Sequence, residues 1–208
     1  MIKFYYYPIS TYSQKVLLAL YEKQVLFEPH LVDIHDQRQL YAFRQIYPLG
    51  KVPLLLGDNQ HVISESSIII EYLDSHFDSG TRLFPDVSSD DIRQMRFLDR
   101  IADLYLNNSV VTLMFAKDRR QAERNEATRC LTFCYQYLNN RLEGKPWIMG
   151  ENFTFADCAI IPPLLYAERH MPFVEYANLL NYFQRAQERP SYQKVLADAL
   201  PLLTSMGV

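Results

Sequence analysis

The apolar pattern of this 208-residue chain changes near residue 78, and this change limits the folds that the chain can adopt. Before that point, short apolar runs alternate with amphipathic helical patterns in the order strand, helix, strand, helix, strand, strand, helix. A helical crossover predicts a parallel pair of strands, whereas a short turn predicts an antiparallel pair. We therefore expect residues 1–78 to form an α/β domain with a mixed sheet and helices packed against it.

Residues 79–91 are expected to form a linker, because Gly, Pro, Ser and Asp dominate this stretch and no apolar period continues through it. From residue 92 onward the patterns are helical, which predicts an all-α domain over residues 92–208. Within this part, "FTFADCAI" places Thr154 and Asp157 at the spacing of a capping box, so a helix should begin there.

The composition argues against several classes of protein. Net charge is −3 and the basic residues are evenly spread, so we expect no nucleic-acid partner. The N-terminal apolar stretch is short of a signal-peptide core, and the longest apolar run contains two prolines; we expect no membrane span and a cytoplasmic location. The cysteines, Cys130, Cys134 and Cys158, lack the spacing of a zinc site, which predicts reduced thiols and no bound metal.

Four hydroxyl side chains at residues 10–13 stand between a tyrosine-rich strand and an amphipathic helix, in the stretch "YPISTYSQKVLLAL". No histidine, cysteine or acid lies among them to activate a nucleophile. One interpretation is structural, because Thr11 and Gln14 have capping-box spacing and would satisfy free amides of the helix. The other is functional, in which a hydroxyl donates a hydrogen bond to an anion.

Two further motifs in the same domain favour a ligand. In "GKVPLLL", Val52 precedes Pro53 and should be extended, which leaves its backbone N–H and C=O available to a ligand. In "SES", at residues 64–66, free amides at a helix start attract an anion, while Glu65 adds a negative charge beside them. A zwitterion with one carboxylate and one ammonium group would satisfy both.

Together these motifs resemble the cytosolic glutathione transferases, in particular serine-type, bacterial-like members. The resemblance covers most of the chain and rests on "PxSxxSxKVxLAL", "PLGKVPLL", "SES" followed by "IIIEYLD", "FTFADCAI" and "RAQERPSYQKVL", in the order of the family. It implies a thioredoxin-like α/β N-terminal domain followed by an all-α C-terminal helical bundle. It also implies a homodimer that uses glutathione as co-substrate, without a metal, against a small hydrophobic electrophile.

The resemblance assigns the central role to Ser10, whose hydroxyl would hydrogen-bond the glutathione sulfur. Tyr6 is the rival, since it lies where tyrosine-type members place a phenol; alternatively, it shares strand parity with Ile2 and Phe4 and belongs to the core. Thr11 and Ser13 are lesser candidates.

The remaining ligand contacts are also implied by the resemblance. The backbone of Val52, before the family's cis-proline at Pro53, would pair with the cysteinyl portion, while Glu65 and Ser66 would hold the γ-glutamyl end. The glycine carboxylate would be contacted by Lys51 and Arg38.

The helical domain should form the electrophile pocket, with lining residues expected from its aromatic and methionine side chains: Tyr105, Met114, Phe115 and Tyr166. Two functions remain open. One is glutathione transfer to an electrophile. The other is a non-catalytic binding protein on the same fold, similar to stringent starvation protein A, for which the resemblance implies RNA polymerase as partner.

Overall fold

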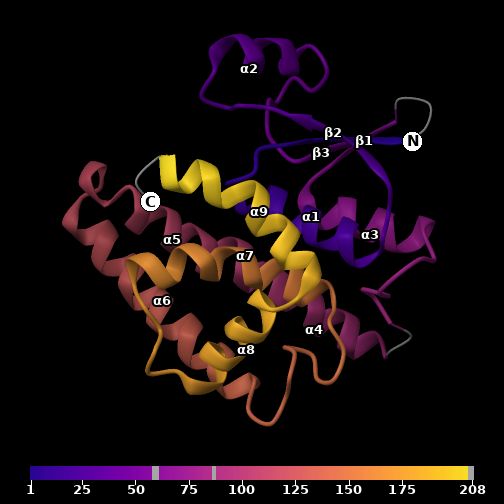
Figure 1. Ribbon diagram of the computed structural model, residues 1–208. Helices are drawn as coiled ribbons and strands as arrows, with labels where there is room; N and C mark the ends of the chain where they lie inside the picture. Colours follow the sequence, from indigo (N-terminus) through magenta and orange to yellow (C-terminus); the bar gives the residue numbers. More distant parts are fainter. Residues whose placement is uncertain (58–60, 86–87, 206–208) are drawn as a thin grey trace. The chain divides into compact units, whose positions relative to one another are not determined.

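The computed structural model describes residues 1–57, 61–85 and 88–205. The chain divides into two compact units (Figure 1). The first contains Met1–Arg82 together with the C-terminal residues from Gln193 on, and the second contains Leu83–Tyr192. The sequence placed all residues after 91 in one helical domain, so the grouping of the C-terminal residues with the first unit differs from that expectation.

The first unit is built on a four-stranded mixed sheet with the order β2-β1-β3-β4. The strands are β1 (Ile2–Tyr6), β2 (Phe27–Leu31), β3 (Leu54–Leu56) and β4 (Val62–Ser64). β1 pairs parallel with β2, and β3 pairs antiparallel with β1 and β4, which confirms the predicted sheet. The expected turn between β3 and β4 includes residues 58–60, which lie outside the described residues.

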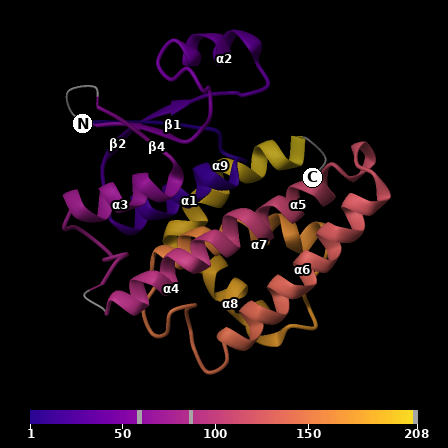
Figure 2. The ribbon, with the colours of Figure 1, turned by 180° about the vertical axis from the view of Figure 1, so that it is seen from behind.

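Three helices cover this sheet: α1 (Thr11–Glu22), α2 (Gln37–Arg44) and α3 (Ser66–His76). Figures 1 and 2 show α1 and α3 on one side of the sheet and α2 on the other. Alternate residues of β1 are buried, as expected for a strand with one fully covered face. The α2 side has a smaller core, made of Val32, Phe43, Leu54 and Leu56.

The first residues of the expected linker are fixed to the end of α1. The Ser79 hydroxyl donates to the Lys23 carbonyl at 2.6 Å, and the Thr81 amide donates to the Glu22 carbonyl at 2.8 Å. Gly80, with φ +64°, lies so close that a Cβ there would be 2.2 Å from the Glu22 oxygen. This stretch therefore packs as part of the first unit, whereas residues 86–87 of the linker lie outside the described residues.

All regular secondary structure in the described residues of the second unit is helical, apart from one isolated bridge between Trp147 and Gly150. Its first long helix runs through α4 (Ser89–Arg100), a π-helical stretch (Ile101–Asn107) and α5 (Asn108–Met114). A short 3₁₀ turn (Ala116–Asp118) leads to α6 (Gln121–Arg141), which is followed by α7 (Phe155–His170), α8 (Ala177–Gln187) and the start of α9 (Pro190–Ser205). The predicted all-α architecture is confirmed.

Helix α7 is the centre of the second unit, since every residue from Phe155 to Ala167 is buried. The predicted capping box is present at its start: the amide of Thr154 donates to the Asp157 carboxylate at 2.8 Å. In the described part of the chain, no helix has both the length and the apolar character needed to cross a bilayer.

Candidate functional site

The strand register brings the predicted ligand-binding segments to one edge of the sheet. Leu54, the first residue of β3, pairs with Tyr5 near the end of β1 and with Ser64 at the end of β4. The segments that leave or enter the sheet at this edge therefore carry Ser10, Val52–Pro53 and Glu65–Ser66. The end of β2 lies at the same edge, because Leu31 pairs with Tyr6.

Ser10 is the N-cap of α1. Its backbone is extended (φ −74°, ψ 119°), and its side-chain oxygen accepts a hydrogen bond from the Ser13 amide at 3.4 Å. The structural interpretation of the sequence placed the cap at Thr11, and this placement is wrong because Thr11 is already the first helical residue. A hydroxyl that accepts one hydrogen bond still has its own proton to donate. Ser10 is half-buried, so its hydroxyl can cap the helix and hydrogen-bond a ligand at the same time.

The neighbouring Ser13 has a structural position instead. Its side chain is fully buried, and its oxygen accepts a hydrogen bond from the Tyr7 amide at 3.3 Å. This contact ties the end of β1 to the first turn of α1. Thr11 is half-buried on the same turn.

Tyr6 points into the core of the first unit. Its ring stacks on Phe4 with 5.3 Å between ring centroids, and its hydroxyl donates to the Asp198 carboxylate of α9 at 3.5 Å. Burial, with the nearby charge of Asp198, raises the pKa of Tyr6 to about 12. The phenol therefore stays protonated at neutral pH, with that proton directed to a carboxylate. Sequence reasoning missed Asp198, and no local signal connects residues so far apart.

Val52 and Pro53 precede β3 and are joined by a cis peptide bond. Val52 is half-buried and packs against the core on the α2 side of the sheet. The paired part of β3 begins only at Leu54, so the N–H and C=O groups of Val52 lie outside the sheet's hydrogen-bond ladder.

Glu65 is the N-cap of α3 and has an unusual backbone. Its φ is +68°, and its exposed side chain makes no capping hydrogen bond. A residue with a side chain in this region costs about 1–3 kcal/mol in strain, which is typical of ligand-binding positions. No motif in the sequence indicates this backbone conformation. Ser66, the first residue of α3, is buried.

A buried side chain connects α1 to the first turn of α3. Lys15 is only 1% exposed, and its ammonium donates to the hydroxyl of Ser67 in α3 at 3.0 Å. The N-termini of α1 and α3 are therefore held at the same sheet edge, where their free amides create a positive potential suited to anions.

The two proposed glycine-carboxylate contacts are less constrained. Arg38 and Lys51 are both exposed. The backbone of Arg38 is fixed, because its amide donates to the Asp36 carboxylate at 2.8 Å; this hydrogen bond lowers the pKa of Asp36. Arg38 lies at the start of α2, and Lys51 directly precedes the residues that form the cis peptide bond.

The residues expected to line an electrophile pocket differ in exposure. Tyr105 and Phe115 are 49% and 51% exposed, Met114 is half-buried, and Tyr166 is 1% exposed within α7. Tyr166 is a core residue of the helical unit and the other three can contact solutes. Within the described residues, no group of three His, Cys, Asp or Glu side chains could hold a metal ion.

The sequence models of two protein families match this chain. "Glutathione S-transferase, N-terminal domain" matches residues 4–81, and "Glutathione S-transferase, C-terminal domain" matches residues 101–190. Together these matches cover the sheet of the first unit and most of the helical unit.

The chain is also similar to individual curated proteins. The chain is 43% identical to glutathione S-transferase hmp2 of Hypomyces subiculosus over 89 residues, which cover 42% of this chain and 40% of that protein. It is 28% identical to the stringent starvation protein A homolog of Haemophilus influenzae over 91% of this chain and 87% of that protein. The chain spans about two fifths of the length of several of the curated relatives that it matches.

Among solved structures, the glutathione S-transferase of Methylobacillus flagellatus with bound glutathione has a TM-score of 0.83 and 24% sequence identity. The alignment covers 94% of this chain and 98% of that one. At 24% sequence identity, this structural similarity shows a shared fold and nothing beyond it.

Proposed function

Because the chain belongs to the glutathione S-transferase family, we propose that it binds glutathione at this sheet edge and activates its thiol for attack on a small apolar electrophile. The observation that carries the proposal is the position of Ser10. Its hydroxyl caps α1 as an acceptor, keeps a proton to donate, and lies where the register also brings Val52 and Glu65.

The thiol needs stabilisation as an anion, and the proposed donors are strong enough to provide it. A free thiol has a pKa near 8.5, and lowering this pKa by about two units needs roughly 2.7 kcal/mol. One hydrogen bond from Ser10 to the thiolate contributes about 1.5–3 kcal/mol. The N-terminus of α1 adds about 0.3–1 kcal/mol. Glutathione brings the nucleophile, so no protein base is required.

The other parts of glutathione have chemically matched partners at the same edge. The backbone of Val52 offers a donor and an acceptor to the cysteinyl portion, and Pro53 fixes its direction. The Glu65 carboxylate suits the γ-glutamyl ammonium, and the N-terminus of α3 at Ser66 suits its carboxylate. In the same proposal the exposed cations of Arg38 and Lys51 contact the glycine carboxylate.

The test is calorimetric titration of the purified chain with glutathione, followed by turnover of a chromogenic aryl halide. We expect saturable binding and glutathione-dependent release of halide. Absence of binding at millimolar glutathione would overturn the proposal. Methylating the sulfur of glutathione should preserve binding and abolish turnover, which separates recognition of the peptide from activation of its thiol.

A second candidate is a non-catalytic binding protein, favoured by the match to the stringent starvation protein A homolog over 91% of this chain. In that case, RNA polymerase subunits should co-purify with a tagged form of the chain that does not bind glutathione. The exposed Glu65 carboxylate and the unpaired backbone before β3 favour the first candidate.

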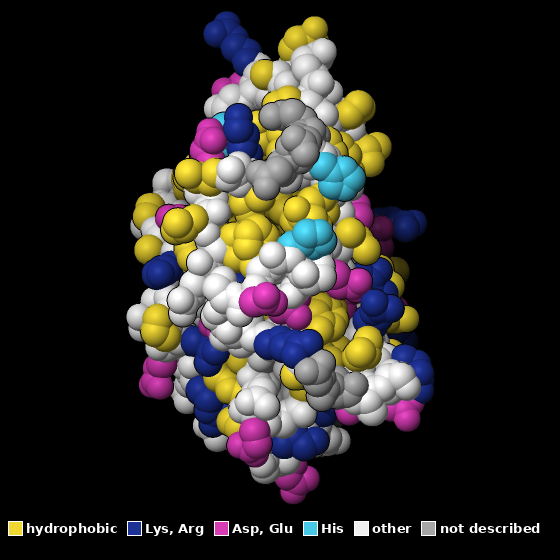
Figure 3. Space-filling view, turned by 90° about the vertical axis from the view of Figure 1, so that its right-hand side faces the viewer, with side chains coloured by type: hydrophobic (Ala, Val, Ile, Leu, Met, Phe, Trp, Pro, Cys, Tyr) yellow, Lys and Arg dark blue, Asp and Glu magenta, His cyan; other side chains and the backbone are white. Residues whose placement is uncertain are grey.

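We also propose that the protein acts as a homodimer in the cytoplasm. On the face in Figure 3, side chains of both charges are mixed and hydrophobic side chains are exposed between them. Exposed hydrophobic residues of the first unit include Val62 and Ile68. Light scattering coupled to gel filtration measures the oligomeric state, and a monomer at micromolar concentration contradicts the dimer.

A further inference from the structure

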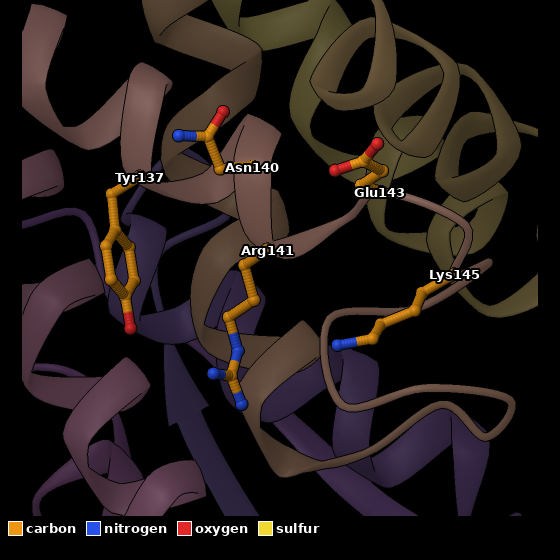
Figure 4. A pocket seen from close by; sticks show the side chains of 5 residues that line it. All are labelled: Tyr137, Asn140, Arg141, Glu143 and Lys145. Atoms are coloured by element: carbon orange, nitrogen blue, oxygen red, sulfur yellow. The ribbon is translucent and has the colours of Figure 1, made fainter.

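A cavity of about 530 Å³ lies in the second unit at the end of α6. It is lined by Tyr137, Asn140, Arg141, Glu143 and Lys145 (Figure 4). We propose that this cavity binds the phosphate group of a small phosphate monoester. None of its residues belongs to the proposed glutathione site, so the two proposals are independent.

Arg141 is the fixed element of this cavity. Its Nε donates to the Ile148 carbonyl at 3.2 Å, and one terminal nitrogen lies 3.3 Å from the sulfur of Met149. The side chain is half-buried, and no carboxylate pairs with it in the described part of the chain. A guanidinium that is already oriented loses little entropy when it binds an oxyanion.

Three further residues with donor groups, Tyr137, Asn140 and Lys145, line the same cavity. Figure 4 shows the Lys145 ammonium directed toward the side of the Arg141 guanidinium and the carboxylate of Glu143 directed away from it. Tyr137 and Asn140 complete the lining, and Figure 4 shows the Asn140 amide directed away from the Arg141 guanidinium. Within the described residues, the polar groups of Tyr137, Asn140 and Lys145 have no hydrogen-bond partner among side chains.

This set of donors matches a phosphate monoester better than a carboxylate. Guanidinium, ammonium and hydroxyl groups are three kinds of donor, whereas a carboxylate has two oxygens and a phosphate monoester has three terminal oxygens and nearly two charges. The cavity is also larger than a phosphate group, which leaves space for the organic part of an ester. Glu143 and the C-terminal end of α6 disfavour an anion, and the two cations oppose them.

The experiment is calorimetric titration of the purified full-length chain with phenyl phosphate at low ionic strength. We expect saturable binding that Lys145→Gln weakens about tenfold, the equivalent of one charge-assisted hydrogen bond. Tyr137→Phe should weaken binding by a smaller factor, because it removes only the hydroxyl and retains ring contacts with Phe97 and Phe133.

The matched control is Lys117→Gln, an exposed lysine in the 3₁₀ turn of the same unit, which should leave the affinity unchanged. Equal loss from both lysine variants would show general electrostatic attraction and overturn the site. Benzoate binding as tightly as phenyl phosphate would overturn the assignment to phosphate. Saturating glutathione should leave the titration unchanged, and competition between the two ligands would also overturn a separate site.

Discussion

In the proposed mechanism, the Ser10 hydroxyl combines a structural and a chemical role, because a serine oxygen can accept one hydrogen bond while its proton is donated elsewhere. The Tyr6 hydroxyl does not keep its proton available in the same way. Its proton is directed to Asp198, and burial raises the pKa of the phenol. The comparison of these two side chains favours serine as the donor to the glutathione sulfur.

Replacing Ser10 by Ala should lower turnover by roughly ten- to a hundredfold, the equivalent of losing a hydrogen bond of about 1.5–3 kcal/mol. Glutathione affinity should change little, since the peptide contacts remain. Tyr6→Phe should leave turnover nearly unchanged. Steady-state kinetics and calorimetry measure both effects.

The control is Ser10→Thr, which keeps both the cap and the hydroxyl and should retain most of the activity. If Tyr6→Phe loses the larger share of turnover instead, the phenol is the donor.

The backbone strain at Glu65 and the proposed contact of its carboxylate with glutathione can be tested separately. Glu65→Gly should stabilise the free protein by about 1 kcal/mol, because glycine adopts a positive φ without strain. The same change removes the carboxylate and should weaken glutathione binding. Urea denaturation measures the first effect, and calorimetry the second.

Glu65→Ala is the matched control, because it removes the carboxylate but keeps a Cβ at the same φ. It should bind glutathione as weakly as Glu65→Gly without the gain in stability. Equal stability of the two variants would contradict the idea of strain at this position.

At the scale of elements, the sequence predicted the mixed sheet and the helical second half because apolar periodicity is set by local geometry. The second strand in the predicted order corresponds to β2, which covers only Phe27–Leu31. The sequence did not reveal the π-helical stretch at Ile101–Asn107, because its apolar spacing does not separate a π turn from an α turn.

Site details were harder to predict than elements. The motifs predicted ligand contacts at Ser10, Val52 and Glu65, which stay predictions, and the register shows that the segments that carry them share a sheet edge. The cap at Ser10 differs by one residue from the capping-box interpretation at Thr11, and no motif in the sequence predicts the positive φ of Glu65.

The start of α7 provides a prediction about pH. Asp157 is fully buried and accepts hydrogen bonds from Thr154 and from the Tyr182 hydroxyl; burial raises its pKa from 3.8 to about 6. Because the folded pKa exceeds the unfolded pKa, the folded state binds the proton more tightly. The stability that this group contributes is present below about pH 4 and is lost as pH rises through about 6.

The measurement is urea denaturation of the parent and Asp157→Asn between these pH limits. The difference in unfolding free energy between them should decrease as pH rises, and an increase would contradict the assignment. Asp91→Asn is the matched control, since Asp91 holds the same place beside Ser88 in the exposed cap of α4. Its replacement should cost no more than about 1 kcal/mol.

At the scale of the whole molecule, the two ends of the chain meet inside the first unit. Tyr6 at the end of β1 bonds Asp198 of α9, and the Lys194 ammonium lies 5.2 Å from the centre of the Tyr21 ring. The C-terminal part of α9 therefore packs on the same unit as the proposed glutathione site, and this grouping could not be predicted from a helical pattern that continues without a break.

Replacing Asp198 by Ala tests this connection. At 3.5 Å the hydrogen bond from Tyr6 is long and should contribute about 1 kcal/mol or less, so the fold should persist with a looser α9. Hydrogen–deuterium exchange should increase in peptides from α9 and from the end of β1. Gln193→Ala, at an exposed position of the same helix, should leave exchange unchanged. Because Ser10 is the proposed thiolate donor, turnover should also be unchanged; a large change in rate would return the catalytic role to the phenol of Tyr6.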